Sequence, residues 1–115
     1  MPYPRINNTY TSNAVAASGV VKVGSGTLFS FFVTNVAAVT RYFMIFDRAT
    51  VPTTGALPLL VFPVYGNSAA TEINKDVLYA SGLVCDNGIA WGLSLDSASF
   101  NPAPITDPLV LIVWA

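Results

Sequence analysis

The chain lacks histidine, and it contains a single cysteine. Without histidine it cannot form a Ser-His-Asp or Cys-His catalytic set, and it lacks the commonest zinc ligand. Cys85 lies in an apolar stretch and has no partner for a disulfide within the chain, which favours a buried small side chain over a reactive thiol. These absences exclude the commonest nucleophilic and zinc-dependent hydrolases.

Acidic residues are the remaining candidates for chemistry. Asp47, Asp86 and Asp96 are the carboxylates that a glycosidase would have to pair. We interpret them as turn and strand-end residues, because aspartate favours such positions by hydrogen bonding to nearby backbone groups. We therefore expect no catalytic residue, no cofactor and no metal site, and we predict that the protein is not an enzyme.

Charge is also scarce. Lys and Arg number 5 and Asp and Glu number 6, so charged residues make up 10% of the chain, whereas average soluble proteins have about 25%. The net charge of −1 offers no basic patch for phosphates, so direct binding to nucleic acid is not expected. With 53% hydrophobic residues, the surface must include exposed apolar groups, which usually mark contact sites. We predict permanent assembly with other subunits; the alternative is a neutral soluble domain coated with Ser and Thr.

Long hydrophobic runs are missing as well. Residues 57–65 are interrupted by Pro58 and Pro63, and residues 109–115 are equally short. Both fall well below the ~20 residues that a membrane helix needs. Residues 1–5 lack the apolar centre of a signal peptide. We therefore predict no membrane contact and synthesis in a cytoplasm.

What the chain does have is a series of short β-forming segments separated by Gly, Pro and Asn turns. No stretch of ten residues keeps a helical period, and only residues 71–78 are ambiguous between a strand and a helical turn. The pattern predicts an all-β, single-domain antiparallel β-sandwich or jelly roll over residues 14–115. Its expected strands are residues 20–23, 27–34, 41–47, 59–65, 79–85, 89–96 and 109–114.

Two of these segments carry more specific information. Residues 89–96 alternate, which predicts that Ile89, Trp91, Leu93 and Leu95 point into the core. Proline cannot donate a hydrogen bond to a neighbouring strand, so residues 59–65, which contain Pro63, should form an edge strand or contain a bulge.

Residues 1–13 are polar and contain two prolines, which predicts an extended N-terminal arm. We expect Tyr3, Ile6 and Tyr10 to lie on a neighbouring copy by exchange of this arm; the alternative is a frayed terminus. Phe100 in a loop and Trp114 at the C-terminal end are further predicted interface anchors, whereas most other aromatic residues should pack in the core. A sugar-binding surface would use the same residue types.

Several stretches together resemble a group of small structural proteins of tailed bacteriophages. The most distinctive is the run Asp47-Arg48-Ala49-Thr50-Val51-Pro52, followed by Gly55 and Pro58. The resemblance covers roughly residues 18–96 and contains no catalytic motif. Its other parts are residues 18–22, 26–29, 34–35, 41–43, 81–84 and 88–90.

The resemblance implies a β-sandwich protein of the virion. We expect a capsid decoration (cement) protein, made in the host cytoplasm, that sits on the outer surface of the head as a homotrimer bound to the major capsid protein. The alternative is a receptor- or glycan-binding module of a tail or fibre, in which Phe100 would stack on sugars. Arg48 is expected to pair with Asp47 or with a neighbouring chain. Pro52, Gly55 and Pro58 should give their loop a defined shape suited to docking, or simply a stable surface loop.

Overall fold

The computed structural model describes residues 8–12, 17–35, 37–66, 82–104 and 110–115. These residues contain eight strands and no helix, and consequently no helix able to cross a membrane. The all-β prediction is confirmed. The strands are β1 (Asn8–Thr11), β2 (Ser18–Val23), β3 (Gly26–Val33), β4 (Arg41–Phe46), β5 (Leu60–Val64), β6 (Leu83–Cys85), β7 (Gly88–Ser94) and β8 (Val110–Trp114).

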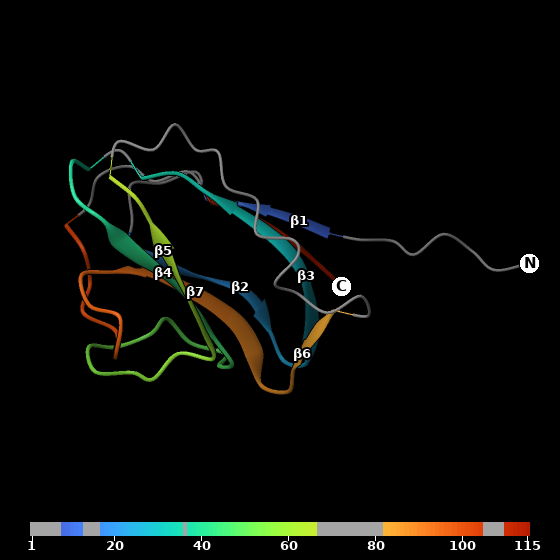
Figure 1. Cartoon of the computed structure of the whole chain (residues 1–115). Coiled ribbons are helices and arrows are strands. Elements are labelled where there is room, and N and C mark those ends of the chain that lie inside the picture. Colours follow the sequence, from blue (N-terminus) through green and yellow to red (C-terminus); the bar gives the residue numbers. More distant parts are fainter. Residues whose placement is uncertain (1–7, 13–16, 36, 67–81, 105–109) are drawn as a thin grey trace, which may run out of the picture.

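The strands form two four-stranded antiparallel sheets, in the orders β1-β8-β3-β6 and β2-β7-β4-β5 (Figure 1). The first strand pairs with the last, the second with the seventh, the third with the sixth and the fourth with the fifth. This nested pairing is the order of a jelly roll, so the sandwich predicted from the sequence has that topology.

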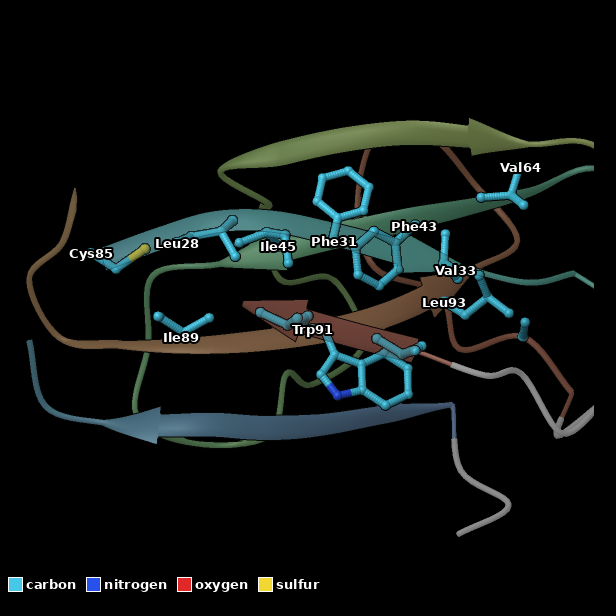
Figure 2. Close-up of a cluster of buried hydrophobic side chains, with 13 residues drawn as sticks. Leu28, Phe31, Val33, Phe43, Ile45, Val64, Cys85, Ile89, Trp91 and Leu93 are labelled. Atoms are coloured by element: carbon cyan, nitrogen blue, oxygen red, sulfur yellow. The ribbon is translucent and has the colours of Figure 1, made fainter. Parts of the chain in front are cut away.

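The core between the sheets is built from the inward side chains of both. Phe31 lies 4.9 Å from Phe43 between ring centroids, and Phe43 lies 6.3 Å from Trp91. Figure 2 shows Ile89, Trp91 and Leu93 at alternate positions of β7, all directed toward this cluster. Their predicted orientation is therefore confirmed. Leu95, predicted to continue the series, lies beyond the end of β7 and is exposed, so that part of the prediction is wrong.

At the edges of the sandwich, one sequence prediction is confirmed and another is not. β5 is an edge strand, as Pro63 predicts. The predicted arm differs, because Asn8–Thr11 pairs with β8 and forms an edge strand of the first sheet. Polar side chains suit this strand because three of its four residues are exposed on the outside of the sheet edge. Residues 1–7 and 71–78 lie outside the described residues.

The centre of the second sheet is buried on both of its faces. Every residue of β7 is buried, including Ala90, Gly92 and Ser94, which alternate with the residues directed into the core. On the same outer side, Met44 and Phe46 of β4 are buried in a second apolar cluster. A two-layer sandwich leaves such a face open to water, so further parts of the chain must cover it.

Candidate functional site

The cover consists of two loops, which we call the loop layer: residues 47–59 between β4 and β5, and residues 95–104 after β7. Phe100 is its apolar centre, packed with Met44, Phe46 and Ala90. The rings of Phe46 and Phe100 meet edge to face at 5.6 Å. A Cβ added to Gly92 would lie 2.5 Å from Cε1 of Phe100, so glycine allows the ring to rest directly on β7.

Backbone hydrogen bonds join the two loops to each other. The N–H of Gly55 donates to the carbonyl of Phe100 at 2.7 Å, and the N–H of Phe100 donates to the carbonyl of Ala56 at 2.9 Å. Gly55 has a φ of 90°, which favours glycine at this turn. The pairing makes the two loops one structural unit, although they are far apart in sequence.

Ser94 anchors the second loop where it leaves β7. Its buried hydroxyl donates to the carbonyl of Asp96 at 2.9 Å and accepts from the N–H of Asn101 at 3.0 Å. The side chain of Asn101 then donates to the carboxylate of Asp96 at 3.0 Å. A serine hydroxyl can donate and accept at once. The single side chain of Ser94 therefore holds both ends of the 96–101 segment against β7.

Asp47 anchors the first loop at the end of β4. Its Oδ1 accepts from the N–H of Asn87 at 2.8 Å and of Gly88 at 3.3 Å, and its Oδ2 accepts from the N–H of Asp86 at 3.3 Å. The sequence predicted that Asp47 would bond within its own turn. The observed partners belong to the β6–β7 turn, so the carboxylate ties two connections at the same end of the sandwich.

The loop layer carries exposed apolar side chains and only three charged residues. Leu57 is 79% exposed, and Val51, Leu59 and Leu95 are also exposed. The layer has three charged residues, and each makes a hydrogen bond within the protein: Asp47 to the β6–β7 turn, Asp96 to Asn101 and Arg48 Nε to the hydroxyl of Thr50 at 3.2 Å. Of the eight large hydrophobic side chains that are exposed among the described residues, four lie in this layer. Exposed apolar groups that gather on one surface usually mark contact sites.

Two of the predicted interface residues belong to this layer. Phe100 is only 2% exposed, so its prediction as an interface or sugar-stacking residue is wrong. The ring fills the space above Gly92 and is not available to a partner. Arg48 is half-buried at the start of the layer and donates to Thr50.

The other predicted interface residues lie away from the layer. Tyr10 packs at the margin of the core, and its hydroxyl accepts a hydrogen bond from Nε1 of Trp91 at 3.1 Å. Trp114 is half-buried beneath Lys22, whose Nζ lies 5.7 Å from the ring centroid. Tyr3 and Ile6 fall outside the described residues.

Sequence reasoning did not single out the polar and glycine residues that shape the loops. Ser94 and Gly92 occupy alternate positions of a strand, where small outward residues normally indicate exposure to solvent. Asn35, fully buried, donates from Nδ2 to the carbonyls of Val39 and Val64, both at 2.9 Å. The sequence carried one signal for them: small residues alternate with large ones in β7. That pattern is compatible with a loop packed closely on the outer face of the strand, and equally with an outer face exposed to solvent.

Cys85 is the single cysteine of the chain, and its environment makes the thiol unreactive. Its side chain is fully buried in the core. Burial, and to a lesser extent the negative charges of Asp47 and Asp86, together raise the pKa of the thiol from 9.0 to about 11. A thiol that stays protonated at neutral pH is a poor nucleophile and a poor metal ligand.

This raised pKa predicts a loss of stability in alkali. The unfolded thiol releases its proton near pH 9, whereas the folded protein holds it to about pH 11. Deprotonation therefore favours unfolding, and the free energy of unfolding should fall between these pH values by on the order of 1–2 kcal/mol. Urea unfolding of the wild type and of Cys85→Ala at pH 8, 9, 10 and 11 isolates this contribution. Equal slopes against pH in the two proteins would contradict it.

No pocket opens in the part of the chain that the structure describes, and no group of three potential metal-ligating residues occurs there. Comparison of the chain with family models, curated proteins and solved structures found no match. Among the described residues, the loop layer is therefore the candidate functional surface.

Proposed function

We propose that this protein is a structural component of a phage particle, a decoration protein that binds the major capsid protein on the outside of the head through its loop layer. The observation that carries the proposal is the exposure of four apolar side chains in that layer, Val51, Leu57, Leu59 and Leu95. Binding would bury these groups and add contacts between shell subunits.

The construction of the layer supports a docking role. Its loops are held to each other by the Gly55–Phe100 and Phe100–Ala56 hydrogen bonds and to the sandwich by Ser94 and Asp47. A surface fixed before binding loses little conformational freedom when it meets a partner. The first loop also contains the run 47–52 with Gly55 and Pro58, the most distinctive part of the resemblance to phage structural proteins.

The jelly-roll topology is compatible with this role without assigning it. Jelly rolls recur in viral capsid proteins and in lectins, and a fold by itself does not determine function. The glycan-binding alternative relied on Phe100 to stack on sugars, and this ring is buried within the layer. Subunit packing therefore has the stronger support.

The proposal predicts that particle binding depends on the apolar groups of the layer. Leu57→Asp should weaken binding to particles that lack the protein at least tenfold, because a carboxylate would replace the most exposed aliphatic side chain. Its free energy of unfolding should change by less than about 0.5 kcal/mol. Co-sedimentation with particles of the encoding phage, prepared without this protein, measures the binding.

Val84→Asp provides the matched control. Val84 is 61% exposed on β6, an edge strand of the other sheet. It should bind like the wild type. Wild-type protein that is present at only a few copies per virion, or that binds glycans and not shells, would contradict the proposal.

A further inference from the structure

The four edge strands of the sandwich differ in how well they resist pairing with another chain. An open edge presents unpaired N–H and C=O groups, and proteins usually block it with a bulge, a proline, a charge or a very short strand. β2 has a bulge between Val20 and Lys22, β5 contains Pro63, and β6 has three residues. β1, which is one residue longer than β6, has no bulge, proline or charge: its register is regular and its sequence is Asn-Thr-Tyr-Thr.

The hydrogen bonds of β1 show which groups face the open side. Ser12 donates its N–H to the carbonyl of Val110 in β8 at 2.9 Å. Backbone groups alternate in direction along a strand, so Tyr10 and Asn8 also face β8. The N–H and C=O groups of Thr9 and Thr11 therefore point away from the sheet, and both residues are exposed.

This arrangement is complementary to itself. When two copies of β1 run antiparallel about a two-fold axis through Tyr10, Thr9 lies opposite Thr11 of the second copy, and Thr11 opposite its Thr9. Each pair exchanges two backbone hydrogen bonds, because both residues present their groups outward. The same register keeps side chains on matching faces of the sheets, and it places threonine beside threonine, a favourable cross-strand pair.

We propose that β1 pairs with β1 of a second copy of this chain and joins two first sheets into one continuous eight-stranded sheet. β1 is the outermost strand of the order β1-β8-β3-β6 and is drawn as a blue arrow in Figure 1. The strand has no charged side chain, so like charges do not oppose the pairing. The contact is independent of the loop layer, and its two-fold symmetry makes a dimer where the sequence analysis predicted a homotrimer.

Proline substitution tests this pairing without disturbing β8. Thr11→Pro removes an N–H that faces the open side, and proline is tolerated at such edge positions. Multi-angle light scattering of the wild type at 100 µM should give twice the chain mass of 12.2 kDa. Thr11→Pro should give the mass of one chain, with a dimer at least tenfold weaker and an unchanged far-UV circular dichroism spectrum. Thr11→Val, which keeps the N–H and a β-branched side chain, should remain dimeric.

A second variant covers the case in which Thr11→Pro does not fold. Thr9→Lys keeps the backbone intact and places a charge on the edge, so it should also be monomeric. A monomeric or trimeric wild type would overturn the proposal, as would a folded Thr9→Lys that stays dimeric. Failure of Leu57→Asp to affect shell binding would leave the dimer unaffected, so the two proposals fail separately.

Discussion

Phe100→Ala is expected to lower the free energy of unfolding by about 3–5 kcal/mol, the range for removal of a buried phenylalanine. The side chain is 2% exposed and fills the space between the loop layer and the second sheet. Its loss leaves a cavity above Gly92 and removes the edge-to-face contact with Phe46. Chemical denaturation followed by tryptophan fluorescence measures the effect. A change below about 1 kcal/mol, the usual size for surface positions, would show that the ring is not part of a packed layer.

A double-mutant cycle with Gly92 makes this test specific. In the wild type, Gly92→Ala places a methyl group 2.5 Å from the Phe100 ring, and we expect a cost of about 1–3 kcal/mol from overpacking. In the Phe100→Ala protein the same methyl enters the cavity, so its cost should disappear. Equal costs of Gly92→Ala in the two backgrounds would mean that the ring does not rest on this glycine.

Asp47→Ala is expected to cost about 2 kcal/mol, because three backbone N–H groups of the β6–β7 turn lose a charged acceptor. The loss should be smaller than for Phe100→Ala because the turn is exposed and water can replace part of the bonding. Asp96→Ala is the matched control. The exposed carboxylate of Asp96 accepts a hydrogen bond from the side chain of Asn101 at 3.0 Å, and its removal should cost less than about 0.5 kcal/mol.

Asp47→Asn separates charge from hydrogen bonding. The amide oxygen can still accept from the N–H of Asn87, so most of the stability should remain. One of the two negative charges that raise the pKa of Cys85 is removed, while burial, the largest cause, remains. That pKa should therefore fall but stay above 9.0. The pH dependence of thiol absorbance at 240 nm, corrected with Cys85→Ala, measures this shift. An unchanged pKa would contradict the assigned effect of Asp47.

Most of the fold could be predicted from local pattern. The alternation in residues 89–96 placed Ile89, Trp91 and Leu93 in the core, and Pro63 placed β5 at an edge. Both depend on properties of a single strand: a side-chain period of two, and a missing N–H. β1 was harder, because Asn8–Thr11 contains one apolar side chain and is recognisable as a strand only through its pairing with β8.

The candidate site could be predicted much less well. Loop position favoured Phe100 as an exposed aromatic residue, and tertiary contact reversed that expectation by placing it over Gly92. Nothing near Asp47 in the sequence indicates that its partners are about 40 residues away in the β6–β7 turn. In both cases the deciding partner belongs to a segment that only the folded sheet brings close.

The amino-acid sequence by itself determined that the chain forms strands, that these strands carry the apolar side chains of a core, and that the chain has no histidine for a Ser-His-Asp or Cys-His set. These follow from residue type and spacing, which act locally. Only the tertiary structure decided which loops cover the second sheet, which apolar side chains remain exposed, and which of the described strands form the sheet edges. Those outcomes depend on how segments distant in sequence meet, because the same side chain is buried or exposed according to what packs against it.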